Sequence, residues 1–353
     1  MQNFSDSTVN ENSSVLPVEG TEDTLTDENA ENTEAMSKDD GLIDFVDMVN
    51  DHFVIKLPNG EYPLSVKQPM IPADQGKEDM RHREDISADV SDFGHYRVYA
   101  SSIRGTGKRD MIHPGIRQDS YAVGSSGNRW IIGAVADGVS ASSKAHMLAD
   151  YMAQFTANRL TIKLEECSRI SEIDWAEESK IIREAAYEYC RDYCQQHQLE
   201  GSYLKYFATT LEFIIVGMDE DNDGEYAYVS ISGDGNGYIF NKEGLLEVIK
   251  SSDDSEGKKN SVHSEAVVAL PREPGDPFVR YGVLNDGEYI LIATDGYAKI
   301  GNKHMKIGEY LFDKLTKVNG IITYLQAMDF YAFQNDDDRT GIMIGRKTDA
   351  GRN

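Results

Sequence analysis

Three aspartates stand beside short apolar runs in this sequence. Asp137 and Asp295 each come at the end of such a run and are followed by glycine, and Asp337 lies in an acidic turn just before the apolar residues 341–344. A short apolar stretch bounded by turn signals is typical of a buried β-strand, so strand ends can bring these carboxylates together at one edge of a core. Crowded carboxylates repel one another unless a cation lies between them. The sequence therefore predicts a site for divalent metal.

The predicted ligands are all oxygens, and this restricts the metal. Carboxylate and carbonyl oxygens, with no His or Cys among them, favour hard ions such as Mg²⁺ or Mn²⁺. Two such ions about 3.5–4 Å apart acidify a bridging water and hold phosphoryl oxygens for in-line attack. Glycine at position 138 would let the backbone approach an ion closely. This chemistry hydrolyses phosphate esters without a covalent phosphoenzyme.

The elements that would position these residues are expected from Gly94 onward. Strand patterns rich in β-branched and aromatic residues cover residues 96–102, 120–123, 130–135, 207–216, 226–232, 237–240, 289–293 and 340–344. Helical patterns cover residues 142–164 and 175–197, and a third helix is expected over 307–316 or beyond Asn319. Helices inserted between series of hairpin strands favour an α+β sandwich over a doubly wound parallel sheet.

Composition separates the first part of the chain from the rest. With 353 residues and 40% hydrophobic content, the chain can bury a large core. Residues 1–92 are predicted to form an acidic, largely disordered tail and linker, with a short helix and a hairpin at about 42–62. Residues 93–349 are predicted to form the folded domain. The tail could be a phosphorylation target, a self-inhibitory segment or a solubilising segment.

The net charge limits the partners. A formal charge of −26 and a pI near 4.6 argue against nucleic acid and against an acidic membrane surface. Neither a secretory signal nor a run of about 20 apolar residues is visible. Three cysteines, an odd number, suit a reducing compartment better than a disulfide framework. A cytoplasmic location is the resulting expectation.

Five short motifs occur in the order found in one enzyme family. They are Arg117-Gln118-Asp119-Ser120, Ala136-Asp137-Gly138, Ser232-Gly233-Asp234-Gly235, Thr294-Asp295-Gly296 and Asp337-Asp338-Arg339-Thr340. The series resembles that of the metal-dependent type 2C serine/threonine protein phosphatases, particularly their divergent bacterial branch, from Gly94 to near Arg346. The resemblance implies a four-layer α-β-β-α sandwich with two mainly antiparallel sheets flanked by helices.

The resemblance also implies catalytic roles for three of the aspartates. Asp137 would bridge two Mn²⁺ or Mg²⁺ ions, and the Gly138 carbonyl would bind one of them. Asp295 and Asp337 would hold the other ion. The water that bridges the ions would attack the phosphorus.

Other positions implied by the resemblance lie around these ligands. Asp119 and Gln118 would stand behind them or reach one ion through water, and Asp234 would face a third ion. Relatives often carry an acid where this chain has Lys299, which argues against a third ion and offers an ammonium to offset the carboxylates. Relatives often carry a histidine, proposed as general acid, where this chain has Val139, so water or another group would supply that proton.

The arginine that commonly grips the substrate phosphate in this family has no clear match. Pro114 falls near its position, and Arg104, Arg109 and Arg117 are close in sequence. A guanidinium group suits phosphate because its N–H groups form a bidentate fork. Arg117 is the preferred candidate for phosphate binding, and the alternative for all three is an ordinary surface or loop base.

The leading hypothesis is a cytoplasmic, Mn²⁺- or Mg²⁺-dependent phosphatase acting on phosphoserine or phosphothreonine in proteins. Its partners would be phosphorylated protein substrates and a cognate Ser/Thr kinase. One alternative is a signalling module with a phosphatase fold that binds phosphoprotein and has weak or no turnover. Another is a small-molecule phosphatase or nucleotide hydrolase, since the sequence does not show the substrate pocket.

Two further patterns have simpler readings. Residues 219–224 resemble the start of a calcium-binding loop, but the twelfth position is Ser230 rather than Glu, which favours a hairpin turn. Cys190 and Cys194 lie one helical turn apart with His197 nearby, which could indicate a soft metal. Reduced thiols on a helix are favoured because no fourth ligand is evident.

Overall fold

A computed structural model of the protein describes residues 84–109, 115–250, 268–272, 275–298, 305–330 and 337–347, with the backbone of three earlier strands. Those strands, β1 (Val46–Val49), β2 (His52–Leu57) and β3 (Gly60–Leu64), form a small antiparallel sheet in that order. The predicted hairpin is confirmed as β2 and β3. The predicted short helix is wrong, because the β-branched segment at residues 46–49 pairs with β2. The predicted tail before it lies outside the described residues.

Two antiparallel sheets form the centre of the folded part. The six-stranded sheet has the order β11-β10-β13-β14-β5-β4 and contains β4 (Ile86–Phe93), β5 (Tyr96–Ile103), β10 (Asn236–Asn241), β11 (Gly244–Val248), β13 (Tyr289–Ala293) and β14 (Arg339–Arg346). The five-stranded sheet has the order β12-β9-β8-β7-β6 and contains β6 (Ser120–Ser126), β7 (Trp130–Ala136), β8 (Leu211–Gly217), β9 (Glu225–Ser232) and β12 (Phe278–Val283). Every residue of β7 and β8 is buried, because both faces of these strands are covered.

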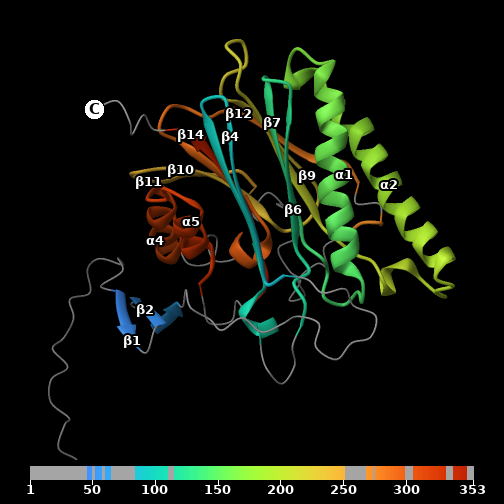
Figure 1. Cartoon of the computed structure of the whole chain (residues 1–353), viewed down its shortest axis with the longest axis horizontal. Coiled ribbons are helices and arrows are strands. Elements are labelled where there is room, and N and C mark those ends of the chain that lie inside the picture. Colours follow the sequence, from blue (N-terminus) through green and yellow to red (C-terminus); the bar gives the residue numbers. More distant parts are fainter. Residues whose placement is uncertain are drawn as a thin grey trace, which may run out of the picture. The chain divides into compact units, whose positions relative to one another are not determined.

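Helices cover the outer faces of both sheets (Figure 1). α1 (Ala145–Glu165) and α2 (Trp175–Gln196) pack on the five-stranded sheet, and α4 (Met305–Thr316) and α5 (Ile321–Met328) pack on the six-stranded sheet. A third apolar cluster fills the space between the sheets. The layer order is therefore α-β-β-α, as the resemblance implies, and both alternatives for the third helix are present. No helix in the described part of the chain is long and apolar enough to cross a membrane.

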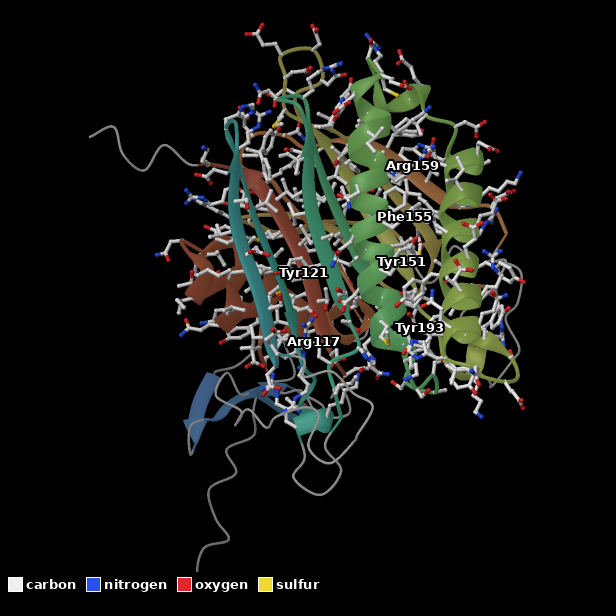
Figure 2. The ribbon with its side chains drawn as sticks, turned by 45° about the vertical axis from the view of Figure 1, so that its right-hand side comes forward. Arg117, Tyr121, Tyr151, Phe155, Arg159 and Tyr193 are labelled. Atoms are coloured by element: carbon white, nitrogen blue, oxygen red, sulfur yellow. The ribbon has the colours of Figure 1, made fainter. Side chains whose placement is uncertain are left out.

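α1 and α2 are held together by side chains that face each other (Figure 2). Arg159 on α1 lies 2.9 Å from the Glu178 carboxylate on α2. The rings of Tyr151 and Tyr189 stack with their centroids 4.4 Å apart. α2 begins after Asp174, whose carboxylate accepts hydrogen bonds from two N–H groups of the first turn.

The sequence patterns miss β4, β11 and β12. β4 pairs with β5 along its whole length, from Ile86 opposite Ile103 to Phe93 opposite Tyr96. Its sequence contains Ser and Asp at alternate positions, which have low strand propensity, and its side chains are mostly half-buried or exposed as expected for an edge strand. Part of the segment predicted to be linker up to Asp92 is therefore strand, and the six-stranded sheet begins at Ile86.

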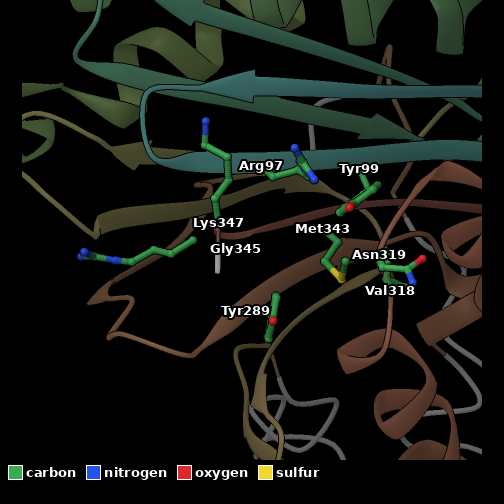
Figure 3. Close-up of a pocket in the computed structure, with 9 residues that line it drawn as sticks. Arg97, Tyr99, Tyr289, Val318, Asn319, Met343, Gly345 and Lys347 are labelled. Atoms are coloured by element: carbon green, nitrogen blue, oxygen red, sulfur yellow. The ribbon is translucent and has the colours of Figure 1, made fainter. Parts of the chain in front are cut away.

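A cavity of about 300 Å³ opens on the face of the six-stranded sheet that carries α4 and α5 (Figure 3). It is lined by Arg97, Tyr99, Tyr289, Val318, Asn319, Met343, Gly345, Arg346 and Lys347. The bases in this lining have acidic partners: Arg97 pairs with Asp92, and Arg346 pairs with Asp223. None of the lining residues belongs to the aspartate motifs.

Candidate metal centre

Asp137 stands where β7 leaves the five-stranded sheet, and its backbone is fixed on both sides. Its N–H donates to Thr210 Oγ1 at 3.0 Å. Its carbonyl accepts from the Thr210 N–H at 2.8 Å and from Thr209 Oγ1 at 2.8 Å. These hydrogen bonds fix the backbone of Asp137, from which its carboxylate projects at the end of the sheet.

Three carboxylates converge at the ends of strands from both sheets. Asp137, Asp234 and Asp295 each offer one oxygen, and these oxygens lie within 4.8 Å of one another. Asp234 occupies the turn between β9 and β10, and Asp295 follows β13 after one residue. Asp295 is buried and Asp234 is exposed, so the group faces outward from the edge of the core. Such spacing suits a cation with oxygen ligands.

Two glycines let the motif segments approach one another. A Cβ at Gly138 would lie 2.7 Å from the carbonyl oxygen of Gln118, and a Cβ at Gly296 would lie 1.8 Å from that of Asp338. Neither position can carry a side chain without moving backbone. The glycine that follows Asp137 and the one that follows Asp295 are therefore required for the motifs to pack together.

Asp119 lies behind the group and is almost fully buried. Its Oδ2 accepts a hydrogen bond from Thr294 Oγ1 at 2.7 Å, which links the motif before β6 to the motif after β13. Burial raises the pKa of Asp119 to about 7, and the charge of Asp338 adds to this shift while Lys108 opposes it. The supporting role that the resemblance implies for Asp119 stays a prediction.

Electrostatics at Asp137 show why the group fits a cation. Burial raises the pKa of Asp137 well above its ordinary value, and the charges of Asp119, Asp295 and Asp337 add to this shift. Lys108 acts in the opposite direction. Carboxylates that ionise with difficulty beside one another are stabilised as anions by a bound cation. The donor set is therefore suited to a hard divalent ion, and the ion itself would come from solution.

Asp337 and Asp338 mark the other end of the cluster, where they contact a base. Lys108 Nζ lies 2.7 Å from Asp338 Oδ2 and 3.0 Å from Asp337 Oδ1. The side chain of Asp338 is fully buried and also accepts the N–H groups of Gly105 and Gln118. Asp337 is about one-third exposed. Asp338 thus organises the loops, while Asp337 faces the site.

No motif in the sequence marks Lys108 as part of the site, and none gives Asp338 a role of its own. Lys108 belongs to the 3₁₀ helix η1 (Thr106–Arg109). The available signal is the run of three aspartates at residues 336–338, since a buried acid needs a partner. The neutralising role considered for Lys299 falls outside the described residues.

Two of the arginines considered for phosphate binding have acidic partners within the fold. Arg104 Nε lies 3.0 Å from Asp85, and an Nη of Arg109 lies 2.8 Å from Asp329. Both guanidinium groups are fully or almost fully buried. Their charges are enclosed within the fold, so of the alternative of an ordinary surface or loop base, the surface position does not apply to them.

Arg117, the preferred candidate for phosphate binding, is buried as well. Its guanidinium donates to the carbonyl oxygens of Glu84 at 3.1 Å and Asp119 at 2.9 Å. Figure 2 shows it near one end of the strands, below Tyr121 of β6. In this arrangement Arg117 ties β6 to the segment before β4, and its binding of phosphate stays a prediction.

The acidic segment at residues 219–224 and the two cysteines of α2 have the simpler structures that were expected for them. Residues 219–224 connect β8 and β9, and Asp219 pairs with Arg129 at 2.9 Å, which confirms the hairpin-turn interpretation. Cys190 and Cys194 are free, buried thiols that belong to the apolar cluster under α2. Burial raises the pKa of the Cys190 thiol to about 12 and that of Cys194 in the same direction. They are core residues.

Comparison with known proteins gives one family. The sequence model of the protein phosphatase 2C family matches residues 106–330. No curated protein matches the chain. Similar solved structures include a bacterial serine phosphatase, with 17% identity, a TM-score of 0.49 and coverage of 72% of this chain and 100% of that one. Serine/threonine phosphatase Stp1 from Staphylococcus aureus has 18% identity, a TM-score of 0.49 and coverage of 76% and 100%. PppA, a key regulatory component of T6SS in Pseudomonas aeruginosa, has 16% identity, a TM-score of 0.47 and coverage of 72% and 99%.

Proposed function

The chain belongs to the protein phosphatase 2C family, whose sequence model matches more than half of it, and on this premise we propose a Mn²⁺- or Mg²⁺-dependent phosphatase that hydrolyses phosphoserine and phosphothreonine esters on proteins. One observation carries the proposal: carboxylate oxygens of Asp137, Asp234 and Asp295 lie within 4.8 Å of one another. Oxygen-only donor sets favour Mg²⁺ and Mn²⁺ over softer metals.

Some residues at this site would bind the ion, and others would support those ligands. A bound divalent ion would lower the pKa of a coordinated water and offset the charge of the phosphoryl oxygens. Asp137, Asp234, Asp295 and the Gly138 carbonyl would hold it. Asp119, fixed by Thr294, supports the group from behind. A second ion, which the resemblance implies, would need Asp337, and that carboxylate contacts Lys108 at 3.0 Å.

The leaving alcohol must receive a proton, and the chain has no side-chain donor at the position where relatives carry histidine. Val139 occupies it, with its backbone N–H donating to the Ala208 carbonyl at 3.0 Å. We assign the protonation to water. A weaker dependence on leaving-group acidity than in an enzyme with a general acid would contradict this assignment.

The test is hydrolysis by the purified full-length protein. We expect it to release phosphate from a phosphoserine or phosphothreonine peptide and from an aryl phosphate when Mn²⁺ is present. Chelation with EDTA should abolish both reactions, and added Mn²⁺ should restore them. Absence of metal-stimulated hydrolysis of both substrates would contradict the proposal, and hydrolysis of the aryl phosphate alone would favour a small-molecule phosphatase.

A second candidate function has its own support. The contact between Lys108 and Asp337, together with Val139, is what a signalling module with weak turnover would require. Such a module would bind a phosphopeptide and release little phosphate in the presence of Mn²⁺. Calorimetry with the phosphopeptide, alongside the hydrolysis assay, separates the two candidates. The cytoplasmic location and the cognate kinase partner stay predictions.

A further inference from the structure

The acidic cluster of this protein contains a base at one end. Lys108 Nζ contacts both Asp337 Oδ1 and Asp338 Oδ2, at 3.0 and 2.7 Å. Asp337 Oδ1 also accepts the backbone N–H of Asp338 at 2.8 Å, so this oxygen already has two donors. The three carboxylates that group within 4.8 Å of one another do not include Asp337. The described part of the site therefore has a group of three carboxylates and, in addition, two carboxylates that contact Lys108.

Lys108 is held in place by its surroundings. Its N–H donates to the Gly105 carbonyl and its carbonyl accepts from the Gly115 N–H, both at 3.0 Å. The stem of the side chain packs on Gly115, where an added Cβ would lie 3.1 Å from Lys108 Cγ. The next residue, Arg109, donates to the Arg104 carbonyl at 2.8 Å. The side chain of Lys108 is only 18% exposed, unlike an ordinary surface lysine.

The ammonium of Lys108 lies between two carboxylates, 3.0 Å from Asp337 Oδ1 and 2.7 Å from Asp338 Oδ2. Its positive charge therefore occupies the place beside Asp337 that a cation would need. A dication placed on Asp337 would lie a few ångströms from this charge and would be repelled by it. It would also have to compete for an oxygen that already accepts two hydrogen bonds.

We propose that the ammonium of Lys108 replaces the second divalent cation, so that the protein binds a single Mn²⁺ or Mg²⁺ ion, at Asp137, Asp234 and Asp295. The inference rests on the proposed function and specifies its metal requirement. Lys108 is a positioning residue in this arrangement: it fixes Asp337 and Asp338 and supplies positive charge beside them. The protein would then bind fewer ions per chain than the two that the family resemblance implies.

The experiment is a calorimetric titration of metal-free, full-length protein with Mn²⁺ at pH 7. We expect about one ion per wild-type chain and about two per chain of Lys108→Met, which keeps the length of the stem but removes the charge. Lys108→Arg, which keeps the charge, should stay at about one. Thermal melting of the same proteins gives a second readout, because an additional bound ion stabilises the folded state: Mn²⁺ should raise the Tm of Lys108→Met more than that of the wild type.

The outcomes separate this inference from the proposed function. Two ions per wild-type chain would overturn the inference even if neither variant folds, and so would unchanged stoichiometry and an equal Tm rise in Lys108→Met. In both cases metal-stimulated hydrolysis by the wild type would leave the proposed function standing. Absence of Mn²⁺ binding by the wild type would overturn both.

Discussion

Two lysines contact segments that carry the aspartate motifs, and they use their charge differently. Lys250 Nζ donates to Glu212 at 2.9 Å and to the Gly233 carbonyl at 2.6 Å, and so holds the turn between β9 and β10 from beneath. Lys108 instead contacts Asp337, a carboxylate that faces the site, at 3.0 Å. Lys250 therefore stabilises the backbone near the site, while Lys108 neutralises part of the charge of the site.

The difference lies in the carboxylate that each lysine meets. The side chain of Glu212 is 2% exposed, so its pairing with Lys250 is enclosed within the fold. Asp337 is 35% exposed and adds to the raised pKa of Asp137, so its pairing with Lys108 changes the charge of the site itself. The role of a base close to an acidic site therefore has to be inferred from the groups that it contacts.

The largest expected effect comes from removing Asp137, one of the three grouped carboxylates. Asp137→Asn should lower kcat/KM for Mn²⁺-dependent hydrolysis by about 10³-fold, since losing several kcal/mol of charge stabilisation corresponds to about three powers of ten. The measurement is hydrolysis of a phosphopeptide at saturating Mn²⁺. Asp192→Asn, on the exposed side of α2 beside Arg191, is the matched control and should leave the rate unchanged. Equal rates for the two variants would remove Asp137 from the site.

A change of stability is expected from replacing Lys250. Lys250→Met leaves Glu212 buried without its cation, which should lower the free energy of unfolding by about 3–5 kcal/mol. Urea denaturation measures the change. The control is Lys317→Met, whose ion pair with Asp313 is exposed and should contribute less than about 0.5 kcal/mol. Similar losses in both variants would show that Lys250 is not a structural cation.

A pH dependence of stability is expected from Asp119 in the metal-free protein. Its pKa is about 7 in the folded state, against about 3.9 in an unfolded chain, so the folded state binds the proton more tightly. This contribution to stability is complete below about pH 4 and is lost as pH rises to about 7, at no more than about 1.4 kcal/mol per pH unit. The stability of the wild type should therefore fall relative to Asp119→Asn across this window. Urea midpoints in EDTA from pH 4 to 8 test it, and a constant difference would contradict the assignment.

The smallest effect is expected from shortening the chain ahead of Glu84. Among the described residues, the contacts given above for the two lysines and the grouping of the three aspartates involve residues after Glu84. Removing residues 1–83 should leave Mn²⁺ affinity within about twofold of the full chain, measured by calorimetry. Removing residues 1–93 is the contrast, because it deletes β4 and also Asp85, which pairs with the fully buried Arg104. If the longer deletion is as stable as the shorter one, β4 is not required by the sheet.

Local patterns in the sequence predict most of the central strands, α1, α2 and one further helix at the place of α4 or α5, because these elements have a regular apolar period. β13, for example, is predicted at its observed bounds, residues 289–293. β4 escapes prediction because its strand character comes from pairing with β5 rather than from its Ser- and Asp-containing sequence. The segment at residues 46–49 is read as helix for a related reason: its apolar spacing suits a helix, and its pairing with β2 decides for a strand.

The sequence by itself determined that several aspartates would stand at strand ends of an α+β protein, because strand periodicity and turn glycines are local properties. Only the tertiary structure decided which carboxylates group together and which base meets them. Lys108 and Asp338 are 230 positions apart, and Asp119 meets Thr294 across 175. No local pattern encodes such contacts, because they depend on how two sheets pack face to face and bring their strand ends to one edge.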